Sequence, residues 1–131
     1  MRYTKTDRNI IVPYFHIIFT LPSVLRQFTL YNQAVIYDLF YKASSYTLNQ
    51  FSKDKKYLGA RMGFMGILHS WGQTLCYHPH LHYIVTGGGL VPDKSQWLRL
   101  AVSEEIYLSG KSHVKGDDGP FHTTIQRSLS K

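Results

Sequence analysis

The sequence is poor in cysteine, in acidic residues and in long hydrophobic runs, and each shortage excludes a class of protein. A single cysteine, Cys76, excludes an internal disulfide framework and a cysteine-based structural zinc cluster. The longest stretch without Asp, Glu, Lys or Arg, residues 62–92, is interrupted by histidines, Gln73 and Pro79, which is not typical of a membrane span. These features predict a soluble, cytoplasmic protein with no membrane partner.

The chain nevertheless has the material for a folded domain. Its 131 residues are 44% hydrophobic and 15% aromatic, which excludes a wholly disordered chain and suits a single domain. Fifteen basic and eight acidic residues leave a net charge of +7. Ten of the basic residues and four of the acidic residues lie in residues 1–97. Such an excess favours polyanions through counterion release, or it serves solubility alone.

Local patterns predict an α+β fold. Residues 9–21 predict a buried strand whose odd-numbered residues 15–19 share one face and whose even-numbered residues 14–20 share the other. Residues 29–53 lack Gly and Pro and repeat apolar side chains at steps of three and four, which predicts a long amphipathic helix. Two apolar runs, 63–70 and 80–86, predict an antiparallel β pair, followed by turns at 87–89 and 90–93. The prediction is therefore an antiparallel sheet with one long helix packed on it and an incomplete core.

Histidines gather at the predicted β pair. His78, His80 and His82 lie within five residues, and His69 lies on the preceding run. His80 and His82 share one face of an extended strand, about 6–7 Å apart, so they can hold one metal ion between them. If the intervening loop closes symmetrically, His69 lies nearly opposite and supplies a third ligand. Three imidazoles leave positions open for substrate or water, as catalytic metal sites do.

The other histidines fit this site less well. His78 precedes Pro79, which bends the chain, so His78 is predicted to orient a ligand rather than to bind the metal. His16 is a weaker candidate, for which a core or edge position is the alternative. His113 and His122 are predicted to be solvated.

Basic and aromatic residues near these segments are candidates for DNA contacts. Lys55, Lys56 and Arg61 follow the predicted helix and could contact phosphates, although a solvated basic face explains them equally well. Trp71 and Tyr77 flank the histidines and could stack on unpaired bases. The three glycines at 87–89 could admit a phosphate close to the backbone, but a flexible turn explains them more simply.

Three segments, in this order, carry a resemblance to a known family. They are PYFHIIFTLP at 13–22, LHSWGQTL at 68–75, and HPHLH at 78–82 with IV at 84–85 and GGGL at 87–90. Over residues 12–97 the chain resembles the HUH-endonuclease transposases of the two-tyrosine, rolling-circle insertion-sequence group. The resemblance implies that His80-Leu81-His82 binds Mg²⁺ or Mn²⁺ on the central strand of an antiparallel sheet.

The resemblance also implies a reaction and its partners. A tyrosine hydroxyl attacks a phosphodiester of single-stranded DNA with help from the metal, which leaves a 5′-phosphotyrosine and a free 3′-hydroxyl for strand transfer. Single-stranded DNA is the expected substrate, and association with another transposase chain is a further expectation. No cofactor beyond the divalent metal is implied.

The sequence departs from the family pattern at two places. The cysteine-rich zinc region that precedes the family's first strand has no counterpart, and no tyrosine motif surrounds Tyr107, the only tyrosine after Tyr83. No catalytic residue is therefore assigned, and whether the chain is itself an enzyme is left open. We expect a truncated transposase, with residues 1–97 forming part of the catalytic domain and residues 98–131 a divergent, poorly ordered tail.

Two alternatives to an active transposase segment remain at this point. One is a basic DNA-binding module without a competent metal site. The other is an inactive transposase remnant that does not fold stably, because a sheet that lacks strands leaves an edge exposed.

Overall fold

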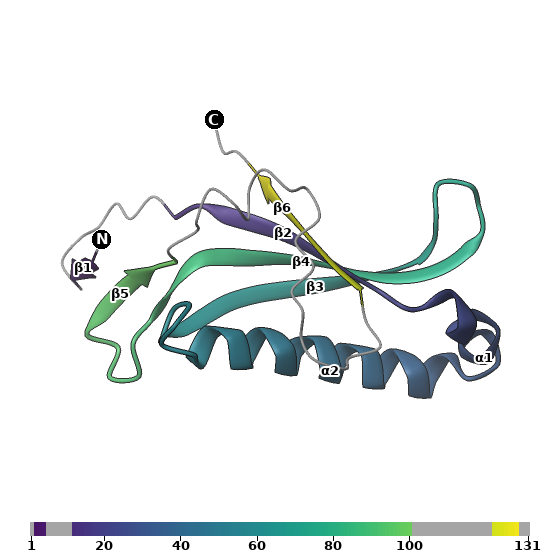
Figure 1. Ribbon diagram of the computed structural model, residues 1–131, viewed down its shortest axis with the longest axis horizontal. Coiled ribbons are helices and arrows are strands. Elements are labelled where there is room, and N and C mark those ends of the chain that lie inside the picture. The colour runs from purple at the N-terminus through teal and green to yellow at the C-terminus, as the bar shows by residue number, and fades with distance from the viewer. Residues whose placement is uncertain (1, 5–11, 101–121, 129–131) are drawn as a thin grey trace.

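The computed structural model describes residues 2–4, 12–100 and 122–128, which form an antiparallel sheet with a long helix on one face (Figure 1). This confirms the predicted α+β class. The elements, in chain order, are β1 (Arg2–Thr4), β2 (Tyr14–Thr20), the short 3-10 helix η1 (Ser23–Leu25), α1 (Arg26–Tyr31), α2 (Gln33–Lys53), β3 (Arg61–Trp71), β4 (Tyr77–Leu90), β5 (Gln96–Arg99) and β6 (His122–Ser128).

The sheet is organised around β4, its longest strand. β3 pairs along one edge of β4, while β2 and β5 pair with successive parts of the other edge. β6 lies beyond β2, and β1 lies beyond β5. All of these pairings are antiparallel. Because β3 lies on one side and β2 and β5 lie on the other, β4 has neighbours on both sides along most of its length.

The strand predicted at 9–21 is present as β2, and its two faces alternate as expected. Phe15, Ile17 and Phe19 are buried, whereas Tyr14 on the other face is exposed. Residues 9–11 lie outside the described part of the chain. Strict alternation arises because successive side chains of a strand point to opposite sides of the sheet.

The prediction of one continuous helix over 29–53 was wrong, because Asn32 divides it. α1 ends at Tyr31 and α2 begins at Gln33, with Asn32 in a non-helical conformation (φ −133°, ψ 39°). The Asn32 side chain donates a hydrogen bond to the Phe28 carbonyl oxygen, a local alternative to helical pairing that asparagine readily offers. The predicted end at Lys53 is confirmed.

α2 packs against the sheet through a narrow stripe. Four side chains at steps of four residues are buried on it: Phe40, Ser44, Leu48 and Ser52. Val35, Leu39 and Tyr46 are exposed elsewhere on the helix surface. Apolar side chains therefore occur on both the packed and the solvent-facing sides, and the separation of polar from apolar residues is less complete than the spacing suggested.

The predicted β pair is present as β3 and β4, but both strands are longer than expected, and the predicted turn at Gly87–Gly89 was wrong. β4 continues through all three glycines to Leu90, and all three are buried. A Cβ atom on Gly88 would lie 2.4 Å from the Leu98 carbonyl oxygen, and one on Gly89 would lie 2.5 Å from that of Arg61. Close approach of neighbouring strands, rather than chain reversal, explains these glycines.

The core lies between the helix face of the sheet and α2. Its centre is Tyr83, whose ring makes edge contacts with Phe19 and Phe64. The Tyr83 hydroxyl is 2.8 Å from Ser44 Oγ on α2, so the buried phenol is hydrogen-bonded. The buried cluster also contains these residues: Ile17, Leu21, Phe40, Leu48, Leu58, Ala60, Met62, Leu81 and Val85.

The predicted tail, residues 98–131, falls partly outside the described residues, which omit 101–121 and 129–131. Within it, β6 pairs with β2 over seven residues, from Thr20 opposite His122 to Tyr14 opposite Ser128 (Figure 1). The division predicted at residue 97 falls inside β5. Among the described helices, none combines the length and the apolar character that a membrane crossing requires.

Candidate metal centre

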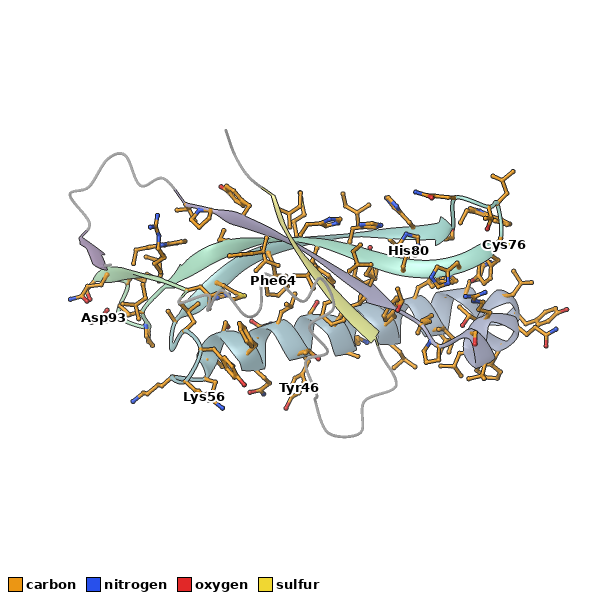
Figure 2. The ribbon with its side chains drawn as sticks, turned by 45° about the horizontal axis from the view of Figure 1, so that its top comes forward. Tyr46, Lys56, Phe64, Cys76, His80 and Asp93 are labelled. Carbon is orange, nitrogen blue, oxygen red and sulfur yellow. The ribbon has the colours of Figure 1, made fainter. Side chains whose placement is uncertain are left out.

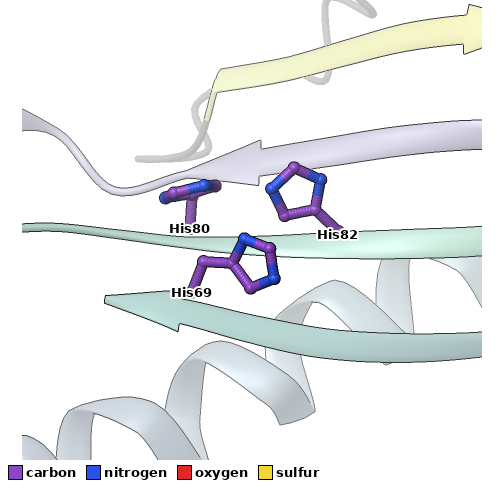
Figure 3. Close-up of side chains that lie close together, drawn as sticks. All are labelled: His69, His80 and His82. Atoms are coloured by element: carbon purple, nitrogen blue, oxygen red, sulfur yellow. The ribbon is translucent and has the colours of Figure 1, made fainter. Parts of the chain in front are cut away.

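Three histidines meet on the sheet face that points away from α2 (Figure 3). His80 and His82 project from β4, and His69 projects from β3 directly opposite His80. One ring nitrogen of each lies within 4.8 Å of those of the other two. The structure thus brings together the three residues that the sequence nominated as metal ligands.

The spacing of these nitrogens is slightly wider than a coordinated metal requires. At the outer limit of 4.8 Å, three nitrogens stand about 2.8 Å from a common centre, against about 2.0–2.1 Å for a Zn–N bond. The ring of His69 on β3 already lies close to those of His80 and His82 on β4, with centroids 5.4 Å and 4.4 Å apart, so side-chain rotations can bring the three nitrogens closer together. The arrangement therefore fits a single cation.

The donor set constrains which cation fits. Imidazole nitrogens suit Zn²⁺, Fe²⁺ and similar ions, whereas Mg²⁺ and Mn²⁺ favour oxygen ligands. His69 is exposed and the other two histidines are half-buried, so water or a phosphate oxygen can reach the same point. For Mg²⁺ or Mn²⁺ these oxygens would complete the coordination shell.

His80 is oriented by the backbone of its own strand. Its Nδ1 lies 2.6 Å from the His78 carbonyl oxygen. A carbonyl only accepts, so Nδ1 of His80 carries the proton and donates it, which leaves the Nε2 lone pair for a metal. Hydrogen bonding of the remote ring nitrogen is the usual way in which proteins orient metal-binding histidines.

His82 is oriented by a side chain from β2. Its Nδ1 lies 2.7 Å from Nε2 of His16, and the two rings are nearly parallel, with centroids 4.9 Å apart. Burial, followed by the nearby charges of His69, His80 and His16, lowers the pKa of His82 to about 4. His82 is therefore neutral at neutral pH, which is the form that binds metal.

His78 contributes through its carbonyl oxygen rather than as a third ligand. Its ring stacks on that of His80, with centroids 5.5 Å apart, and lies outside the group of three. Burial, then the charges of Arg26 on α1 and of His80, lowers the pKa of His78. The predicted orienting role thus has a physical basis, although its backbone rather than its imidazole makes the hydrogen bond.

The five residues proposed for DNA contact fall into two separate groups. Arg61 and Trp71 are the first and last residues of β3, so at about 3.3 Å per residue they lie roughly 30 Å apart. Lys55 and Lys56 lie near the Arg61 end, and Tyr77 lies beside Trp71 near the histidines. Figure 2 shows this separation, with Lys56 towards the side of the molecule where Asp93 lies and His80 towards the side where Cys76 lies.

Tyr77 and Trp71 differ in their surroundings, although both lie between the two apolar runs that predicted the β pair. Tyr77 begins β4 and is half-buried, with its hydroxyl 2.7 Å from that of Tyr37 on α2. Burial and then this hydrogen bond raise the pKa of Tyr77. Trp71 is 60% exposed and its ring meets that of Tyr77 edge-on. Trp71 is the better placed of the two to stack on a base.

Two residues of this region carry only a weak signal in the sequence. His16 contacts His82, one of the three grouped histidines, and Arg26 is close enough to His78 to affect its titration. The alternation of β2 did place His16 on the exposed face, but its approach to His82 depends on how β2 pairs with β4. Tyr107 and His113 lie outside the described residues, and for His122 the structure describes only the backbone, in β6.

Comparison with known proteins identifies the family. Residues 63–128, half of the chain, match the model of the Y2_Tnp family, which is described as "Putative transposase". The chain belongs to this family. The match includes β3 and β4 with the three histidines, and it continues through β6, beyond the limit at Trp97 that the sequence motifs suggested.

Two transposases illustrate the relationship. The chain is 46% identical over 85 residues to the "Putative transposase y4qJ" of Sinorhizobium fredii, which covers 65% of this chain and 21% of that protein. It is 36% identical over 93 residues to the transposase for insertion sequence element IS801 of Pseudomonas savastanoi pv. phaseolicola, which covers 71% and 22%. The chain thus spans about a fifth of the length of these relatives. No solved structure matches it significantly.

Proposed function

We propose that this chain forms the metal-binding sheet of a transposase that cuts and joins single-stranded DNA, with His69, His80 and His82 as the metal ligands. The convergence of their three nitrogens on one open sheet face carries the proposal. Family membership supplies the reaction class, since the matched relatives are transposases of insertion sequences or are described as such.

The residues of the chain have defined tasks in this proposal. His80 and His82 present Nε2 towards the cation because their Nδ1 atoms are occupied by the His78 carbonyl and by His16. A bound divalent cation would draw charge from the non-bridging oxygens of a scissile phosphate. The side of the sheet away from α2 leaves the histidines accessible to an extended strand of DNA.

We assign the nucleophile to none of the tyrosines on or near β2 and β4. Tyr83 is buried on the opposite face, and Tyr37 and Tyr77 bond to each other between α2 and β4. Tyr14 shares the open face, but it lies four residues along β2 from Ile18, the partner of His82, or about 13 Å away. We propose that the attacking tyrosine belongs to residues outside those described here.

DNA contacts are proposed at both ends of β3. Exposed Trp71 offers a stacking surface beside the histidines, braced by Tyr77. Lys55, Lys56 and Arg61 would hold phosphates several nucleotides away, because they lie at the far end of β3. A second transposase chain remains a proposed partner.

Binding of Mn²⁺ tests the metal site directly. We expect the purified chain to bind one Mn²⁺ in isothermal titration calorimetry and to bind single-stranded DNA more tightly with the ion present. His80→Ala combined with His82→Ala should abolish both effects. The matched control is Ile84→Ala, an exposed residue next along the same face of β4, which should preserve them. Unchanged Mn²⁺ binding in the double variant would refute the assignment.

A DNA-binding module without a metal site is the second candidate, and the distance between the basic group and the histidines favours it. If it is correct, removing Lys55, Lys56 and Arg61 weakens DNA binding while removing His80 and His82 does not. A thermal melt of the purified chain separates both candidates from an unstable remnant, because a remnant would show no cooperative unfolding transition.

A further inference from the structure

We infer that His16 is a positioning residue whose Nε2 accepts a hydrogen bond from the Nδ1–H group of His82 and so leaves Nε2 of His82 free to bind metal. The inference rests on the proposed metal site, in which His82 is a ligand. It assigns to β2, the strand that contributes no ligand, a part in building that site.

The sheet register places the two rings together. His16 lies opposite Ile84, and His82 lies opposite Ile18, so the two histidines are diagonal neighbours on the same face of adjacent strands. Their rings are nearly parallel, at 13°, with Nε2 of His16 and Nδ1 of His82 2.7 Å apart. This is the distance of a hydrogen bond with one proton between the two nitrogens.

The direction of that hydrogen bond decides whether His82 can bind metal through Nε2. When two neutral imidazoles share such a contact, one must donate while the other accepts. If His82 donates from Nδ1, its Nε2 has a free lone pair. If His16 donates instead, the remaining proton of His82 lies on Nε2 and blocks coordination there. Metal binding is therefore coupled to the tautomer of His16.

His80 shows why this coupling is specific to His82. The acceptor for His80 is a backbone carbonyl, which cannot donate, so its tautomer is fixed with or without metal. The acceptor for His82 is a side chain that can reverse its role. Of the two ligands on β4, only His82 depends on a second side chain for its binding-competent form.

The geometry distinguishes positioning from direct ligation. The ligand nitrogens of His69, His80 and His82 lie within 4.8 Å of one another, and His16 is not in that group. His16 instead meets the Nδ1 edge of His82, away from Nε2. A cation bound at Nε2 of His82 therefore has His16 on the far side of the ring.

Two substitutions at position 16 test the inference. His16→Gln offers an amide oxygen at a similar reach, whereas His16→Leu offers no acceptor. We expect His16→Leu to weaken Mn²⁺ binding about 10–100-fold in calorimetry, as loss of an orienting partner does, and His16→Gln to stay within about threefold of the unsubstituted chain. Thermal melts in EDTA establish that both variants fold.

Nuclear magnetic resonance provides a second readout on the unsubstituted chain. Long-range ¹⁵N–¹H correlations with Zn²⁺ bound should show the His82 proton on Nδ1 and the His16 proton on its own Nδ1. A proton on Nε2 of His82 in the metal-bound state would overturn the inference even if no variant at position 16 folded.

The outcomes separate this inference from the proposed function. If the unsubstituted chain binds no Mn²⁺, the metal site fails and the inference fails with it. If it binds Mn²⁺ and folded His16→Leu binds equally well, only the inference is overturned. If His16→Gln loses as much affinity as His16→Leu, the imidazole itself is required and His16 is a ligand rather than a positioning residue.

Discussion

The two faces of β4 differ although one short stretch of sequence builds both. Leu81, Tyr83 and Val85 point towards α2 and are almost fully buried, whereas His80 and His82 alternate with them on the open face. The first set is constrained by packing, and the second is left accessible for chemistry. A single strand therefore serves as core and as candidate site, because its side chains alternate with a period of two.

Each face also contains a hydrogen-bonded polar contact, and the two contacts have different consequences. On the helix face the Tyr83 hydroxyl bonds to Ser44, which satisfies a polar group inside the core. On the open face His16 bonds to His82, and both rings remain only partly buried. The first contact supports the fold, while the second leaves ring nitrogens available.

The largest effect is expected on the free energy of unfolding, when one residue on each face is replaced by alanine in separate variants. Leu81→Ala removes a side chain with no exposed surface and should lower the free energy of unfolding by about 2–5 kcal/mol. His80→Ala, one residue earlier on the open face, should change it by less than about 1 kcal/mol. Urea unfolding in EDTA measures both. Equal losses would mean that the open face is packed as tightly as the helix face.

Two glycines of β3 sharpen the same comparison. A Cβ atom on Gly66 would lie 2.6 Å from the Tyr83 ring, so Gly66→Ala must displace a buried side chain at about 1–3 kcal/mol. A Cβ atom on Gly63, on the open face, would lie 3.4 Å from Thr86, which is ordinary contact. Gly63→Ala should therefore lower the free energy of unfolding by less than Gly66→Ala does. Melting temperatures of the two variants test this order, which a larger loss for Gly63→Ala would contradict.

The smallest effect expected is a pH dependence that arises on the open face. The pKa of His82 is lowered to about 4, whereas an unfolded histidine titrates near 6.5. Between these values the unfolded chain binds more protons, so stability falls as the pH decreases. Solvent screening limits the size of the loss because the ring is only partly buried.

We expect the melting temperature in EDTA to fall between pH 6.5 and pH 4, and to fall less steeply for His82→Gln. The matched variant is Ile84→Ala, which should retain the full slope. An unchanged slope in His82→Gln would assign the dependence to other groups, of which His78, with its own lowered pKa, is the first candidate.

Local sequence patterns were sufficient for much of the fold. The alternation of β2 and β4 and the end of α2 at Lys53 follow from side-chain periodicity and from the charged residues after the helix. The break at Asn32 was missed because apolar spacing continues across it, whereas the hydrogen bond from its side chain to Phe28 interrupts the helix. The glycines of β4 resemble a turn in the sequence because the residues that require them, Trp97 and Arg61, are not adjacent to them in the chain.

The sequence by itself determined that His80 and His82 share a face, because a strand alternates its side chains, and it carried the motifs of the transposase family. Only the tertiary structure decided that His69 faces His80 and that His16 reaches His82, because strand register depends on how buried faces pack against α2. It likewise separated Arg61 from Trp71 by the length of β3. Contacts between distant segments follow from packing, which no local pattern encodes.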